Sequence, residues 1–151
     1  MQTPILLTGI TLLAVAAYGD VKTLRIPNLL VAAVAALGVA RLAVIGDLSI
    51  VVHTIAASVV VLVVAFLLFS RNLVGGGDAK LISAASLLVG YHDLLHFLLV
   101  MSLCGGLVSL AVLVSHRRSS LQPRARMAVP YGVAIAGGGI VTLLFQPSLL
   151  G

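Results

Sequence analysis

Six apolar segments separated by short polar stretches make up most of the chain. They cover residues 1–19, 27–45, 48–70, 78–90, 94–115 and 129–145. An α-helix needs about 20 mainly apolar residues to cross the hydrocarbon core of a bilayer. The fourth segment is short for a full span, which is acceptable where neighbouring helices shield it from lipid. The pattern therefore predicts an all-α polytopic membrane protein, with six transmembrane helices in a single domain over residues 1–151.

The composition supports this fold class. Hydrophobic residues make up 61% of the chain and charged residues 9%, whereas charged residues are about 25% of a typical soluble domain. The net charge of +5 is compatible with nucleic-acid binding, but the basic residues lie in short loops, where membrane topology explains them better. We therefore expect the lipid bilayer, and no nucleic acid, as a partner. The single cysteine, Cys104, can form neither an intramolecular disulfide nor a cysteine-rich zinc site.

The first apolar segment, residues 1–19, contains no charged side chain. It could be a cleaved signal peptide, because small residues occur at Ala14, Ala16 and Ala17. A signal peptide normally begins with a basic region, and this segment has none. We therefore expect a first helix that is retained in the mature protein.

The distribution of basic residues predicts the orientation of the bundle. If all six segments span the bilayer, eight of the nine basic residues lie on one side. These are Lys22, Arg25, Arg71, Lys80, Arg117, Arg118, Arg124 and Arg126. Loops rich in lysine and arginine stay in the cytoplasm, so this side is expected to be cytoplasmic and both termini to face outwards. The ninth, Arg41, lies near the far end of the second segment, where we expect its side chain to extend to the headgroups rather than to contact a substrate.

Two of the four acidic residues lie where apolar sequence meets polar sequence on the predicted cytoplasmic side. Asp78 follows three glycines in the stretch V-G-G-G-D-A-K-L at Val74–Leu81, and Asp20 ends the first uncharged run in the stretch Y-G-D-V-K-T-L-R-I-P-N at Tyr18–Asn28. An ionisable residue beside a membrane span is costly and has a functional role by default. Each aspartate alone could cap a helix. Their common depth in a bundle of six spans favours a joint role.

Two carboxylates that meet at this depth could share one proton across a water molecule. That is the chemistry of an aspartic protease, in which one ionised carboxylate takes a proton from water and the other, protonated, donates to the scissile carbonyl. This chemistry needs no metal and no nucleotide cofactor. A helix N-terminus favours a charged carboxylate and a helix C-terminus a neutral one, by about 0.3 to 1 kcal/mol. We therefore hypothesise that the resting proton lies mainly on Asp20, and that Asp78 is ionised.

The sequence around both aspartates resembles that of the prepilin peptidases. The shared features are G-x-G-D-x-K at Gly75–Lys80, Asp20 followed by I-P-N at Ile26–Asn28, and V-P-Y-G-V-A-I-A-G-G at Val129–Gly138, which is similar to the short members associated with Flp-type tight-adherence pili. The resemblance implies a membrane aspartyl protease of the GxGD class, with Asp20 and Asp78 as its catalytic dyad. It also implies an inner-membrane enzyme that cleaves the leader from prepilin-like precursors at the cytoplasmic boundary.

Other residues of these motifs are expected to support the site. They are Lys22, Pro27, Asn28, Gly75, Gly76, Gly77, Lys80, Pro130, Tyr131 and Gly132. The three glycines can adopt backbone conformations closed to other residues, which allows a peptide to approach closely or Asp78 to move towards Asp20. Each lysine follows its aspartate two positions later, on a different face of a helix. The lysines either extend to the interface or, for Lys80, help to position substrate or tune the dyad, and we expect the last three residues to pack behind the site.

Two other functions are compatible with this sequence. A small transporter or channel component would use the aspartates to bind cations, although no polar residue continues the path through the span. A noncatalytic pilus assembly factor would retain the fold without the activity. A nucleotide-binding loop is disfavoured because the glycine motif lacks the strand–loop–helix setting and the lysine–hydroxyl ending. The sequence leaves the oligomeric state open.

Overall fold

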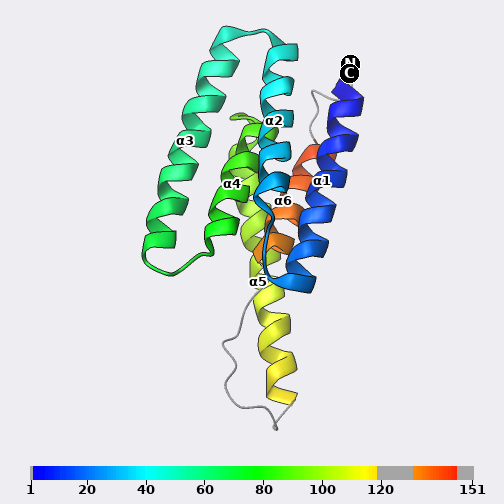
Figure 1. Cartoon of the computed structure of the whole chain (residues 1–151), viewed down its shortest axis with the longest axis vertical. Coiled ribbons are helices and arrows are strands. Elements are labelled where there is room, and N and C mark those ends of the chain that lie inside the picture. Colours follow the sequence, from blue (N-terminus) through cyan, green and yellow to red (C-terminus); the bar gives the residue numbers. More distant parts are fainter. Residues whose placement is uncertain (1, 119–130, 146–151) are drawn as a thin grey trace.

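The computed structural model describes residues 2–118 and 131–145, and in this part of the chain it contains six α-helices and no strand. The helices are α1 (Gln2–Thr23), α2 (Asn28–Ile45), α3 (Leu48–Ser70), α4 (Gly76–Val89), α5 (Leu94–Arg118) and α6 (Tyr131–Leu144). Consecutive helices run in opposite directions along one bundle (Figure 1). The predicted all-α class is confirmed, and each apolar segment of the sequence corresponds to one helix.

Four of the helices are long and apolar enough to cross a membrane. They are Thr3–Thr23 of α1, all of α2, all of α3 and Leu94–Val114 of α5. Many valine, leucine and phenylalanine side chains of these helices are exposed, as expected for contact with lipid. The chain is thus a multi-pass membrane protein. The helices α4 and α6 have 14 residues each, about 21 Å at 1.5 Å per residue, so their status as two further spans stays a prediction.

The turn between α2 and α3 follows from its local sequence. Gly46 ends α2 with a φ of 69°, and its N–H donates to the Leu42 carbonyl at 3.2 Å. Glycine is the usual residue at this left-handed position because it has no Cβ. Asp47 then caps α3, with Oδ1 accepting from the N–H groups of Ser49 and Ile50. This aspartate therefore has an ordinary structural role.

The short helices α4 and α6 form the centre of the bundle. α4 packs against α2, α3 and α6, and α6 packs against α1, α4 and α5. The core combines Leu13 of α1, Leu81 and Leu88 of α4, Phe97 of α5 and Ile135 of α6, all fully buried. Because longer helices surround them (Figure 1), α4 and α6 need not present a full apolar length to lipid.

Glycines let α6 approach its neighbours closely. A Cβ at Gly138 would lie 2.8 Å from Met101 Cβ and 2.9 Å from its backbone nitrogen, so α6 contacts the backbone of α5 at this point. A Cβ at Gly139 would lie 2.7 Å from a methyl group of Leu13 on α1. Small residues permit such packing, and van der Waals contact is a main source of helix association in lipid.

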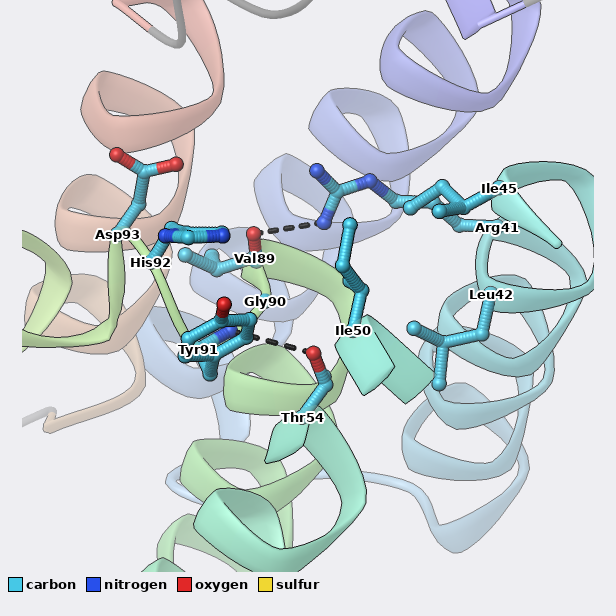
Figure 2. A pocket seen from close by; sticks show the side chains of 10 residues that line it. All are labelled: Arg41, Leu42, Ile45, Ile50, Thr54, Val89, Gly90, Tyr91, His92 and Asp93. Carbon is cyan, nitrogen blue, oxygen red and sulfur yellow. Dashed lines mark hydrogen bonds between the residues drawn. The ribbon is translucent and has the colours of Figure 1, made fainter. Parts of the chain in front are cut away.

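Arg41 contradicts the prediction that its side chain extends to the headgroups. The side chain is buried, with 8% exposed, and Nη1 donates hydrogen bonds to the carbonyl oxygens of Leu88 and Val89, each at 2.6 Å. These carbonyls belong to the last turn of α4, where the helix itself supplies no donors. Figure 2 shows the guanidinium reaching from α2 towards this end of α4. Arg41 of α2 therefore caps the C-terminal end of α4, because its guanidinium supplies the hydrogen bonds that these last carbonyl groups lack within the helix.

Candidate active site

Asp20 is held on a helix rather than in the loop that follows it. α1 continues past the first acidic residue to Thr23, and the Asp20 side chain is only 4% exposed. Its Oδ2 accepts a hydrogen bond from the Gly132 backbone N–H at 2.7 Å. The first N–H groups of a helix have no partner within the helix. Since Gly132 is the second residue of α6, the Asp20 carboxylate satisfies one of them.

The start of α6 fits closely against Asp20. A Cβ at Gly132 would lie 2.8 Å from both the Cβ and the Oδ2 of Asp20, so this position has no room for a side chain. We expected Gly132 to pack behind the site, whereas the structure puts it in direct contact with the aspartate. Tyr131, the first residue of α6, has an exposed side chain, and Pro130 lies outside the described residues.

Asp78 lies in the first turn of α4, which begins at Gly76. Gly75 is the N-cap residue, with an extended backbone at φ −68° and ψ 146°. A Cβ at Gly75 would lie 2.7 Å from Asp78 Oδ2. The Asp78 carboxylate therefore folds back over the start of its own helix, into space that a larger residue at Gly75 would occupy.

The glycine triplet supplies space in this structure, not unusual backbone angles. None of Gly75, Gly76 and Gly77 has a positive φ. A Cβ at Gly76 would lie 3.1 Å from the ring of Phe69, and a Cβ at Gly77 would lie 3.4 Å from Ile26 Cβ. The conformational freedom expected from the sequence is thus not used here. Space is shortest at Gly75, where a Cβ would lie 2.7 Å from Asp78 Oδ2, whereas a Cβ at Gly77 would make an ordinary contact.

Asp20 and Asp78 line the same cavity, which has a volume of about 310 Å³. The other lining residues are Leu24, Arg25, Ile26, Asn28, Gly75, Gly76 and Gly77. The two carboxylates are close enough for the charge of Asp20 to act on Asp78. The structure thus brings together the two aspartates that the sequence singled out. Across residues 2–118 and 131–145, no three histidine, cysteine, aspartate or glutamate side chains are grouped so as to hold a metal ion.

A sequence model described as the type IV leader peptidase family matches residues 7–110, which is more than half of the chain. The chain belongs to the type IV leader peptidase family. The resemblance to prepilin peptidases is thereby confirmed, and membership of this peptidase family implies a protease. The matched range includes Asp20 and Asp78 and ends before α6, which supplies Gly132. No curated protein and no solved structure matches the chain.

A larger cavity, of about 480 Å³, lies at the other end of the leader peptidase bundle. Its lining includes Arg41, Thr54, Tyr91 and Asp93 (Figure 2), and the Tyr91 N–H donates to Thr54 Oγ1 at 3.4 Å. Neither of the motif aspartates lines it. The paired carboxylates therefore belong to the smaller cavity, and that cavity is the candidate active site of the leader peptidase.

The pKa of Asp78 is raised to about 6, first by burial and then by the negative charge of Asp20, while the backbone N–H of Gly75 lowers it. Asp78 lies at the start of α4, outside the four long spans. Asp20 instead accepts the short hydrogen bond from Gly132, which favours an ionised carboxylate. These contacts favour a proton on Asp78, the opposite of the hypothesis drawn from the helix ends, because burial and like charge act against the effect of the helix N-terminus.

The raised pKa of Asp78 predicts that the stability of the leader peptidase depends on pH. A carboxyl whose pKa is higher in the folded than in the unfolded state stabilises the fold at low pH, and this contribution is lost as the pH rises through the folded-state pKa. For Asp78 the loss falls between the ordinary pKa of 3.8 and about 6. The unfolding temperature in detergent should therefore fall between about pH 4 and about pH 7. In Asp78→Asn this part of the decrease should disappear, and an unchanged pH dependence would contradict the assignment.

The predicted supporting residues differ in how close they lie to the site. Lys80 Nζ donates to Asn28 Oδ1 at 3.2 Å and so connects α4 to α2 beside the cavity. Lys22 Nζ lies 5.7 Å from the centre of the Tyr18 ring, and Lys22 does not line the cavity. Pro27 is the N-cap residue of α2 and also lies outside the lining. Asn28 therefore lines the cavity and Lys80 contacts Asn28, whereas Lys22 and Pro27 do not line the cavity.

Leu24 and Arg25 line the cavity, although the sequence did not predict a role for them there. Leu24 has a φ of 52°, a region that bulky residues rarely adopt. Its N–H donates to the Asp20 carbonyl at 2.8 Å, which closes α1 one turn after the aspartate. Leucine gives no local signal for this conformation, and a loop arginine in a membrane protein is explained by topology alone. Neither residue could have been recognised from the sequence.

Proposed function

We propose that this protein is a membrane aspartyl endopeptidase that removes the N-terminal leader from prepilin-like precursors. The observation that carries the proposal is the shared cavity in which Asp20 of α1 acts electrostatically on Asp78 of α4. Membership of the type IV leader peptidase family supports the substrate class. The stretch Val129–Gly138 further supports a short peptidase of the Flp-pilus type.

In the proposed mechanism Asp20 is the base and Asp78 is the acid. Ionised Asp20, which accepts the Gly132 N–H, takes a proton from water as the water oxygen attacks the carbonyl carbon of the scissile bond. Protonated Asp78 gives its proton to the carbonyl oxygen as the tetrahedral intermediate forms. When the carbon–nitrogen bond breaks, the proton on Asp20 passes to the leaving amine and the hydroxyl proton returns to Asp78. Both carboxyls then regain their starting states.

The scissile segment must be extended where it enters the cavity. In a helix, the carbonyl is occupied by the backbone hydrogen bond of the following turn, so Asp78 could not donate to it. The glycine triplet lines the cavity, and the absence of side chains there gives the substrate backbone room to approach. The proposal is therefore cleavage of a short unwound segment next to a membrane-embedded helix.

We propose that the site faces the cytoplasm at the inner membrane. Lys22 at the end of α1, Arg71 after α3 and Lys80 near the start of α4 share the end of the bundle that contains the cavity. Basic residues concentrate on the cytoplasmic side of membrane proteins. The start of α1 would then lie on the outer side of the membrane.

Coexpression with a candidate prepilin in cells that lack their own prepilin peptidase tests this function. N-terminal sequencing should find the precursor shortened by its leader, and cells without this chain should retain it. The purified protein in liposomes should cleave the same bond, which separates an enzyme from an assembly factor that depends on a cellular protease. An uncut precursor beside correctly inserted protein would contradict the proposal.

Nothing in the described part of the chain favours the cation-transporter alternative over proteolysis. The two cavities described above lie at opposite ends of α4. The buried side chains of α4 between those ends are apolar except that of Ser86, whose hydroxyl donates to the Ser83 carbonyl at 2.8 Å, so they form no continuous row of cation ligands. Cation flux through proteoliposomes in the absence of proteolysis would favour the transporter instead.

A further inference from the structure

A second surface of α4 forms the floor of an apolar groove of about 490 Å³. One wall is α2, with Val31 and Val39, and the opposite wall is α3, with Ile55 and Val59. Few contacts join α2 to α3 directly, since α3 packs almost entirely on α4. Figure 1 shows these two helices on either side of α4. The walls belong to membrane-spanning helices, so the groove faces the lipid.

The floor of the groove suits a closely packed helix. It contains Ala84 and Ser83 of α4, with Ser58 of α3 beside them, and small residues of this kind allow two helix backbones to approach. The hydroxyl of Ser83 already donates to the Ala79 carbonyl at 2.9 Å, and Ser58 Oγ accepts from Ser86 at 3.2 Å. These polar groups have partners within the protein, so the groove requires no polar ligand.

The groove meets the aspartate cavity at one end. Lys80 lines the groove, and its Nζ hydrogen bonds to Asn28, which lines the cavity. Lys80 is also only two residues beyond Asp78 on α4. A polypeptide that lies along the groove would therefore reach the two carboxylates by passing the Lys80–Asn28 pair.

We propose that this groove between α2 and α3 is the docking surface for the apolar membrane helix of the precursor. The inference rests on the proposed function, because it takes the cleaved protein as the occupant. The lipid-facing position and the apolar walls fit a membrane-embedded partner, and the small residues of the floor fit a closely packed helix. Because the groove joins the aspartate cavity, the partner that fits best is the substrate. A helix bound in the groove would place its adjoining extended segment at Asp20 and Asp78.

Photo-crosslinking from two adjacent valines of α3 tests the docking surface. Val59 lines the groove, whereas Val60 is of the same residue type, is similarly exposed and does not line it. Benzoylphenylalanine is introduced at either position in an Asp78→Asn background, so that the precursor is bound without turnover. Irradiation of membranes that contain the precursor should give an adduct from Val59, mapped to the apolar segment of the precursor, and little or none from Val60.

A kinetic comparison provides a second readout in the catalytically intact protein. Val59→Trp should raise the KM for the precursor about tenfold, which corresponds to about 1.4 kcal/mol of binding, because the indole fills the groove. Val60→Trp should leave KM unchanged, and both variants should unfold at the wild-type temperature.

Three results would contradict docking in the groove while leaving the proposed function intact. They are equal crosslinking from the two positions, adducts with lipid alone, and an unchanged KM in Val59→Trp. If the wild-type protein cleaves no prepilin, the proposed function fails and the groove inference falls with it.

Discussion

Replacing either Asp20 or Asp78 by asparagine is expected to abolish precursor cleavage. Asparagine keeps the size of the side chain but cannot exchange a proton, so Asp20→Asn lacks the base and Asp78→Asn lacks the acid. General acid–base catalysis contributes about 10²–10⁴-fold to a rate. Because groups that act as a unit have non-additive effects, the double variant should be about as inactive as either single one. The rate of leader removal in proteoliposomes, at matched protein levels, measures these effects.

Asp47→Asn is the matched control for the two aspartate variants. It makes the same chemical change at the opposite end of the bundle, where Asp47 caps α3 by accepting from the N–H groups of Ser49 and Ile50. Asparagine caps a helix about as well as aspartate, so cleavage and stability should stay at the wild-type level. Undiminished cleavage by a well-folded Asp20 or Asp78 variant would rule out the dyad.

Gly132→Ala is expected to lower cleavage about a hundredfold, the cost of moving a catalytic group by roughly 1 Å. The added methyl group would lie 2.8 Å from both Cβ and Oδ2 of Asp20, so α6 or the aspartate must shift. The hydrogen bond from Gly132 that favours ionised Asp20 should lengthen as a result. The effect should appear in kcat rather than in KM, because the proposed docking groove is lined by α2, α3 and α4 and by no residue of α6. Steady-state kinetics in proteoliposomes provide the measurement.

Gly106→Ala is the control for Gly132→Ala. A Cβ at Gly106, on α5, would have no atom within 4 Å, so the same substitution adds a methyl group without a contact. This variant should cleave at the wild-type rate, and alanine in place of a helical glycine should stabilise α5 slightly. A fully active Gly132→Ala protein would mean that α6 does not set the position of Asp20.

The membrane-protein class and the order of helices were predictable because they depend on local properties. Apolar length decides whether a segment forms a membrane helix, and the predicted segments agree with the observed bounds to within a few residues. The largest difference is at the end of α1, which continues to Thr23 because a helix can extend beyond the last uncharged residue. The two candidate aspartates were found for a related reason, since acidic residues are rare in this chain and costly near lipid.

The roles of individual polar residues were predicted less well. Arg41 was expected to reach the headgroups, but its environment is set by the end of α4, 47 residues further along the chain. Lys22 and Lys80 follow their aspartates at the same spacing, yet only Lys80 bonds to a residue of the cavity. Sequence spacing does not distinguish these cases, because the partners come from other helices.

Apolar length, glycine content and the scarcity of acidic residues are local properties of the sequence. They were sufficient to predict an all-helical membrane protein with Asp20 and Asp78 as the candidate catalytic residues. Which carboxyl carries the proton depended on contacts between segments far apart. Gly132 lies 112 residues from Asp20 and favours its ionised form, while burial and the charge of Asp20 raise the pKa of Asp78. Burial and electrostatic coupling arise only when helices pack together, which is why the folded bundle favours a different proton assignment from the one that the helix ends suggest.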